Sequence, residues 1–205
     1  MEWVSREGWG AMAPKRVTPM LRPAAGWWLH HQAGVDRGAV SVRQIQAEHM
    51  FGRLGAADIG YSWLYSLRED RFYVGRGADV VGAHTQGQNV TSEALCVLGN
   101  WDTQEPPERL LTRVAEFGRW RGLPLLGGHR DAPGAATACP GRHLHNKIGR
   151  IRFLMQEDDG MGELSEDAQR FYQKQYELLM RQDARPTSIP TLLSHYRHVR
   201  SWFSK

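Results

Sequence analysis

Residues 1–155 alternate short apolar runs with amphipathic helical patterns, and turns rich in glycine separate them. This alternation constrains the fold more than any other feature, because strands that alternate with helices build a sheet covered by helices. The expected strands are 26–30, 61–67, 71–74, 94–98 and 123–126. The expected helices are 40–54, 106–121 and 144–155. The pattern therefore predicts a single α/β domain.

The rest of the chain has a different character. Residues 156–163 are acidic and contain glycine, which is typical of a linker. Residues 164–205 contain two helical patterns, which Pro186 and Pro190 separate. We predict a domain at 1–155, a linker at 156–163 and a helical C-terminal segment at 164–205.

The basic surface belongs to the first domain. Residues 1–155 carry 19 Lys and Arg against 14 Asp and Glu, whereas residues 156–205 carry 7 against 8. Such a surface suits an anionic partner, either nucleic acid, an anionic membrane or a cell wall that bears carboxylates, and a solvated basic surface without a partner is the alternative. We expect no nucleic-acid partner, because no stripe of clustered Lys and Arg and no nucleic-acid motif accompanies the charge.

The sequence also limits where we expect the chain to act. No apolar run approaches the roughly 18 residues that a membrane-spanning helix needs, so we expect no stable membrane insertion. The first residues lack the basic and apolar regions of a signal peptide. We therefore expect the protein to accumulate in the cytoplasm of the cell that makes it.

A histidine and a cysteine on a loop rich in Gly and Pro carry the clearest chemical signal. His129 and Cys139 stand ten positions apart, and imidazole and thiolate are ligands that tetrahedral zinc prefers. His30 ends an apolar strand and is the best third ligand, because only one of His30 and His31 can face a given side of a strand. Three protein ligands would leave the fourth position open, as in catalytic zinc sites. A chance scatter of the nine histidines remains the alternative at this point.

Seven motifs in residues 1–145 favour the zinc site over a chance scatter of histidines. They are REGWGA at 6–11, WLHH at 28–31, DIGYSW at 58–63, VGRG at 74–77, GAHT at 82–85, LGN at 98–100, and GHRD at 128–131 with TACPG at 137–141. In order and spacing the chain resembles the type 2 N-acetylmuramoyl-L-alanine amidases, a family that includes peptidoglycan recognition proteins and phage endolysins. The resemblance implies an α/β fold with a central mixed β-sheet flanked by helices. It also implies one Zn²⁺ per chain in a groove for bacterial peptidoglycan.

The resemblance assigns roles to single residues. It makes His30, His129 and Cys139 the metal ligands. Tyr61 falls where the family has a catalytic tyrosine near the metal-bound water, although a strand tyrosine alone would be assigned to the core. Thr137 falls where relatives have a lysine or threonine that assists the tetrahedral intermediate.

Other positions concern the substrate or depart from the family pattern. His84 and Asn89 are expected to bind substrate in the groove, with hydrogen bonding within the loop as the alternative. Some relatives carry a glutamate where this chain has Cys96, which we expect to be a small buried residue. Ala78 replaces a tryptophan that is frequent in members selective for diaminopimelate stem peptides, so the stem-peptide preference is left open.

The resemblance implies a zinc-dependent enzyme that hydrolyses the amide bond between N-acetylmuramic acid and L-alanine. The size and the extra C-terminal segment favour a monomeric phage endolysin that stays in the host cytoplasm until the membrane opens and then acts on the cell wall. A peptidoglycan-binding module without catalysis and an amidase of cell-wall recycling are the alternatives. Residues 164–205, which the resemblance does not cover, are expected to target or dock on the cell wall.

Overall fold

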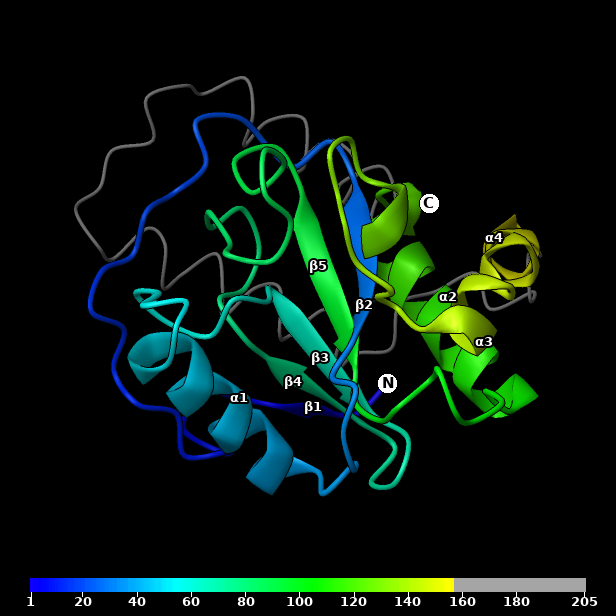
Figure 1. Cartoon of the computed structure of the whole chain (residues 1–205), viewed down its shortest axis with the longest axis horizontal. Helices are drawn as coiled ribbons and strands as arrows, with labels where there is room; N and C mark the ends of the chain where they lie inside the picture. Colours follow the sequence, from blue (N-terminus) through cyan, green and yellow to red (C-terminus); the bar gives the residue numbers. More distant parts are fainter. Residues whose placement is uncertain (157–205) are drawn as a thin grey trace, which may run out of the picture. The chain divides into compact units, whose positions relative to one another are not determined.

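The computed structural model describes residues 1–156, and its centre is a six-stranded sheet in the order β1-β4-β3-β5-β2-β6. The strands are β1 (Trp3–Val4), β2 (Trp27–His31), β3 (Trp63–Ser66), β4 (Arg71–Val74), β5 (Glu93–Val97) and β6 (Leu125–Gly128). The helices are α1 (Ala39–Phe51), α2 (Glu108–Arg121), the 3-10 helix η1 (His129–Asp131), α3 (Arg142–His145) and α4 (Ile148–Gln156). Strands β3 and β4 are antiparallel and the other neighbouring pairs are parallel, so the expected mixed sheet flanked by helices is confirmed (Figure 1).

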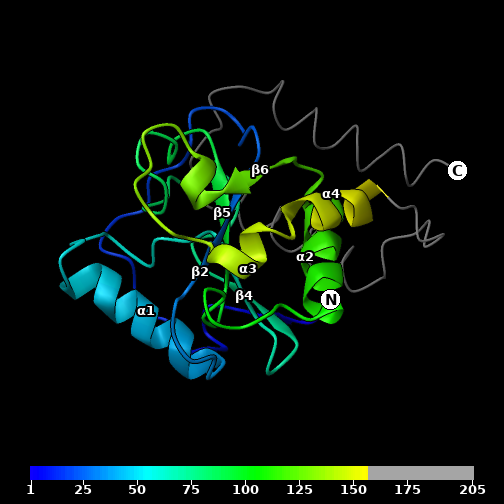
Figure 2. The ribbon, with the colours of Figure 1, turned by 45° about the vertical axis from the view of Figure 1, so that its right-hand side comes forward.

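Two hydrophobic clusters cover the two faces of the sheet. Alternate residues of β5 divide between them, with Leu95 and Val97 in one cluster and Cys96 in the other. The first cluster contains apolar residues of α2 and α4, and the second contains Val42 and Ile45 of α1. Helix α1 therefore lies on one side of the sheet and α2 and α4 on the other, as Figures 1 and 2 show. The central strands are buried from both sides, which holds their carboxyl ends at a fixed edge.

Most elements match the sequence prediction, and the differences are local. Helix α2 ends at Arg121, and the residue that caps it, Gly122, has a φ of 62° in the left-handed region that favours glycine. Strand β6 covers 125–128, two residues later than predicted, and the predicted helix at 144–155 is divided into α3 and α4. The short strand β1 was not predicted, because two residues carry no detectable periodicity.

The predicted domain boundaries fall near the end of the described part. Gln156, predicted as the first linker residue, is the last residue of α4. The rest of the predicted linker and the predicted helical segment at 164–205 lie outside the described residues. Within residues 1–156, every helix is too short or too polar to cross a membrane.

One buried ion pair connects the sheet to α2. Glu93 of β5 is fully buried, and its carboxylate accepts hydrogen bonds from Arg121 Nε at 2.9 Å and Nη2 at 2.7 Å. Trp63 Nε1 donates to the same carboxylate at 2.7 Å, and the Asp79 amide donates at 3.2 Å. Because its donors surround it, the buried charge is compensated.

The variant Glu93→Gln tests this interaction. It preserves the shape of the side chain but removes the negative charge that faces the Arg121 guanidinium, so the free energy of unfolding should fall by about 3–5 kcal/mol. Glu2→Gln is the matched control, since Glu2 pairs with Arg71 at the surface and its loss should cost less than about 1 kcal/mol. Urea unfolding of both variants gives the comparison, and equal effects would show that burial does not strengthen the Glu93 interaction.

Candidate metal centre

The parallel pairing of β2 with β6 brings two histidines together. Leu29 pairs with Gly128, so the next residues along the two strands are His30 and His129. Their ring centroids are 4.6 Å apart. Residues 99 positions apart in number thus become neighbours at one edge of the sheet, because the carboxyl ends of parallel strands lie at the same edge.

Cys139 completes a group of three side chains that could hold a metal ion. One ligand atom from each of His30, His129 and Cys139 lies within 4.8 Å of the others. The Sγ atom of Cys139 is 3.5 Å from Nδ1 of His30. Two imidazoles and one thiol in this arrangement suit a tetrahedral zinc ion and leave one coordination position open.

The loop that carries Cys139 is fixed by backbone contacts. The Arg130 amide donates to the Cys139 carbonyl at 2.9 Å, and the Cys139 amide donates to Thr137 Oγ1 at 3.1 Å. Gly128 allows this close approach, because a Cβ there would lie 2.5 Å from the ring of Pro140. These contacts hold the loop that carries Cys139 against the end of β6, which His129 follows directly.

Burial sets the protonation of the three side chains. It lowers the pKa of His30 well below its usual value, with smaller contributions from His84 and His129, and it also lowers the pKa of His129. Burial raises the pKa of the Cys139 thiol to about 12, although the His31 amide that donates to Sγ at 3.4 Å opposes this. Neutral imidazoles are ready for a metal, whereas the thiol would lose its proton when a cation binds.

His31 points to the other face of the sheet. Its Nδ1 accepts a hydrogen bond from the Trp101 amide at 3.2 Å, and its Nε2 is 3.9 Å from a carboxylate oxygen of Asp102. The expected alternation along β2 is confirmed, because His30 alone of the two contributes a ring nitrogen to the group.

Tyr61 lies beside this group. Its ring centroid is 5.2 Å from that of His30. Burial raises the pKa of Tyr61 well above its usual value, and the thiols of Cys96 and Cys139 raise it further. The phenol therefore keeps its proton and can donate a hydrogen bond. Cys96 is fully buried, as expected, and pairs in register with His30.

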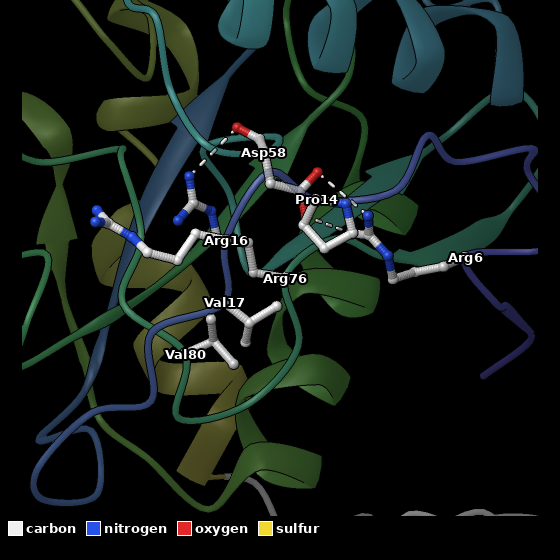
Figure 3. Close-up of a pocket in the computed structure, with 7 residues that line it drawn as sticks. All are labelled: Arg6, Pro14, Arg16, Val17, Asp58, Arg76 and Val80. Carbon is white, nitrogen blue, oxygen red and sulfur yellow. Dashed lines mark hydrogen bonds and ion pairs between the residues drawn. The ribbon is translucent and has the colours of Figure 1, made fainter.

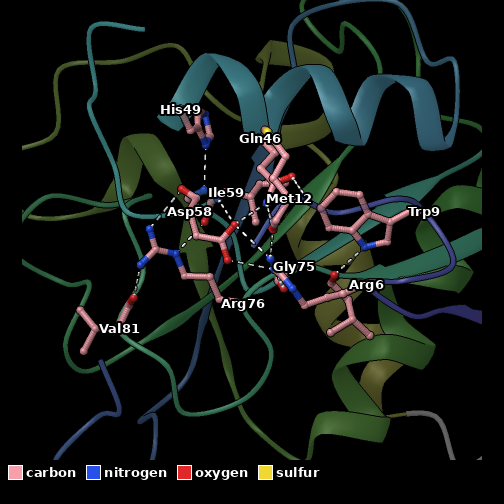
Figure 4. A network of polar contacts seen from close by, with 12 residues as sticks. Arg6, Trp9, Met12, Gln46, His49, Asp58, Ile59, Gly75, Arg76 and Val81 are labelled. Atoms are coloured by element: carbon pink, nitrogen blue, oxygen red, sulfur yellow. Dashed lines mark hydrogen bonds and ion pairs between the residues drawn. The ribbon is translucent and has the colours of Figure 1, made fainter. Parts of the chain in front are cut away.

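A polar network that the sequence did not reveal holds the segment before Tyr61 (Figure 4). The Asp58 carboxylate pairs with Arg6 at 2.9 Å and accepts a hydrogen bond from Gln46 at 2.7 Å. Arg76 donates to the carbonyl of Ile59 at 2.6 Å. A pocket of about 80 Å³ opens beside these guanidinium groups (Figure 3). We assign it a structural role, since Arg6 and Arg76 already bond a carboxylate and backbone carbonyls.

His49 of α1 anchors the same segment from the other side. Its Nδ1 accepts a hydrogen bond from the Gly60 amide at 2.8 Å, and its ring is 5.3 Å from that of Tyr61. Burial and then Arg76 lower the pKa of His49 to about 4, which keeps the ring neutral and able to accept. His49 therefore supports the backbone that positions Tyr61.

A groove of about 770 Å³ includes His129 of this group in its lining. His129, Thr137, His84 and Asn89 all line it, together with Thr85. The Oδ1 atom of Asn89 accepts hydrogen bonds from the amides of His84 and Thr85 at 2.8 and 2.9 Å. The predicted groove residues thus lie together, but Asn89 also has the loop-bonding role that was the alternative.

The known proteins that are similar to this chain in sequence include several peptidoglycan-recognition proteins. No family model matches the chain. It is 34% identical over 158 residues to peptidoglycan-recognition protein SC1a/b of Drosophila simulans, covering 71% of this chain and 83% of the relative. It is 34% identical over 159 residues to peptidoglycan-recognition protein LB of Drosophila melanogaster, covering 71% of this chain and 66% of the relative.

Solved structures agree with the fold. Wild-type Drosophila PGRP-LB superposes with a TM-score of 0.64 at 33% identity, covering 72% of this chain and 92% of that chain. A tyrosine-to-phenylalanine variant of PGRP-LB, solved in complex with tracheal cytotoxin, has a TM-score of 0.63 at 33% identity and the same two coverages.

The variant Cys139→Ser tests the metal centre. Removing one of three ligands should leave an open site that holds zinc weakly, so most of the metal should be lost. Zinc content per chain, measured by atomic absorption after dialysis, should fall from about one in the wild type to a small fraction. His31→Ala is the control and should keep its zinc, because His31 faces the other side. If His31→Ala lost its zinc while His30→Ala retained it, the ligand assignment would be wrong.

Proposed function

The chain belongs to the peptidoglycan-recognition protein family, and from this premise we propose that it is a zinc-dependent N-acetylmuramoyl-L-alanine amidase. The observation that carries the proposal is the convergence of His30, His129 and Cys139, of which His129 also lines a groove. A binding module needs a groove but has no use for three metal ligands with an open fourth position. The motif resemblance found in the sequence supports the same activity.

Each residue of the centre has a defined task in this proposal. His30, His129 and Cys139 hold the zinc ion. When bound, zinc lowers the pKa of a water molecule towards about 7 and polarises the scissile carbonyl. Tyr61 keeps its proton and donates a hydrogen bond to the carbonyl oxygen as negative charge develops there.

Thr137 and the groove residues act on the substrate side. Thr137 lines the groove two residues before Cys139, and its Oγ1 accepts the Cys139 amide. The hydroxyl proton therefore stays available to the tetrahedral intermediate. His84 lines the same groove, which suits a contact with substrate. The PGRP-LB complex with tracheal cytotoxin supports a ligand derived from peptidoglycan.

Two narrower hypotheses from the sequence stay predictions. The endolysin role, with residence in the host cytoplasm before lysis, has no support from the Drosophila relatives. The monomeric state is likewise a prediction. The alternative of a binding module without catalysis is disfavoured by the presence of Cys139, because that alternative requires no third ligand.

Digestion of purified peptidoglycan tests the proposed activity. An amidase should release stem peptides with a new L-alanine amino terminus and leave glycan strands that carry the free lactyl carboxyl group. Mass spectrometry distinguishes these ends from the new reducing ends that a glycosidase would produce. Wild-type protein that binds peptidoglycan but leaves every amide intact would support the binding module instead. Cys139→Ser is the matched inactive control.

Replacing Tyr61 by Phe isolates the hydroxyl group. Tyr61→Phe should retain the fold and the zinc, while kcat falls by about tenfold to a thousandfold, because one donor to the developing oxyanion is lost. KM should change little, since the hydrogen bond is made mainly in the transition state. Steady-state kinetics on soluble muropeptides measures both. An unchanged kcat would restrict Tyr61 to packing against His30.

A further inference from the structure

The Thr85 hydroxyl group lies between two histidine rings. Its Oγ1 is 3.1 Å from Nε2 of His30 and 3.0 Å from Nδ1 of His84. The threonine is 1% exposed, and both rings are buried. Neither the motif comparison nor the spacing of ligands singled out this threonine for a chemical role.

The other nitrogen of His30 determines how protons must be arranged along this chain of contacts. Nδ1 faces the Cys139 sulfur at 3.5 Å, so a metal shared with that sulfur uses the Nδ1 lone pair. The His30 proton must then sit on Nε2, where it can be donated to the Thr85 oxygen. The hydroxyl can donate its own proton onward to Nδ1 of His84, which must be the unprotonated nitrogen of that ring.

The position of the hydroxyl is itself fixed. Asn89 Oδ1 accepts the Thr85 amide at 2.9 Å, and the Thr85 carbonyl accepts the Gln88 amide at 3.0 Å. The threonine backbone is therefore held on both sides within a short loop. Buried acceptors with fixed positions orient a metal-ligating histidine and select its tautomer.

We propose that Thr85 is a positioning residue that holds His30 in the tautomer with Nδ1 directed at the metal and the proton on Nε2. This inference rests on the proposed zinc function, because the tautomer matters only if His30 is a ligand. Without the hydroxyl, Nε2–H would be buried without an acceptor. The ring would then favour the other tautomer, in which Nδ1 carries the proton, donates it to Cys139 Sγ and is blocked for metal binding.

The test compares Thr85→Val, Thr85→Ser and wild type in two measurements. The first is the zinc dissociation constant, from competition with a chromophoric chelator. The second is the tautomer of His30 in metal-free protein, from the ¹⁵N chemical shifts of the ring nitrogens. Thr85→Val has nearly the same shape without the hydroxyl, so zinc affinity should fall by about 10–100-fold. The proton should move from Nε2 to Nδ1.

Two controls separate positioning from general damage. Thr85→Ser restores the hydroxyl and should restore both the affinity and the wild-type tautomer. Thr91→Val removes a different hydroxyl group of the same loop, one that donates to the Gln88 carbonyl at 3.3 Å, so it should change neither the affinity nor the tautomer.

The other possible outcomes also bear on the role of Thr85. If Thr85→Val binds zinc as tightly as wild type, or if the wild-type His30 carries its proton on Nδ1, the proposal is overturned. If wild-type protein binds no zinc, the proposed function fails, and the metal-free tautomer still decides the role of Thr85. If Thr85→Val does not fold, the wild-type tautomer and its retention in Thr85→Ser decide it.

Discussion

The register between β2 and β6 is the constraint on which the rest of the centre depends. The pairing shifts by one residue between Trp27 and Trp28, and this shift places His129 level with His30. In an unbroken ladder His30 would stand beside Gly128, and the second histidine would lie one residue beyond the group. Burial of both faces of the sheet fixes this register, because a further slip would turn the apolar residues of β2 out of their clusters.

The sequence predicted the layered architecture well, since that architecture depends on local patterns. The apolar stripe of α2, the proline before it and Gly122 after it are local signals, and they located the helix closely. Strand β6 was displaced because its second half is Gly127-Gly128, which has no side chain to carry a pattern. Strand β1 is defined by its pairing with β4, and such pairing between distant residues leaves no trace in a single sequence.

Some residues of the candidate site could likewise be predicted from the sequence, and others could not. The ligand histidines and Cys139 could be proposed from donor chemistry and strand alternation. The residues that hold them could not, because Thr85, His49 and the Asp58 network act through contacts between segments far apart in sequence. His49 illustrates the difference. On its helix it is one histidine among nine, and only the folded chain brings its Nδ1 to the amide of Gly60.

The central claim is that two imidazoles and one thiolate of this chain bind one zinc ion and leave a position open. X-ray absorption at the zinc edge of the purified protein tests it most directly. The account predicts one sulfur neighbour at about 2.3 Å and two imidazole nitrogens at about 2.0–2.1 Å, with a further light atom from solvent. A spectrum without sulfur, or one with four protein ligands, would contradict it.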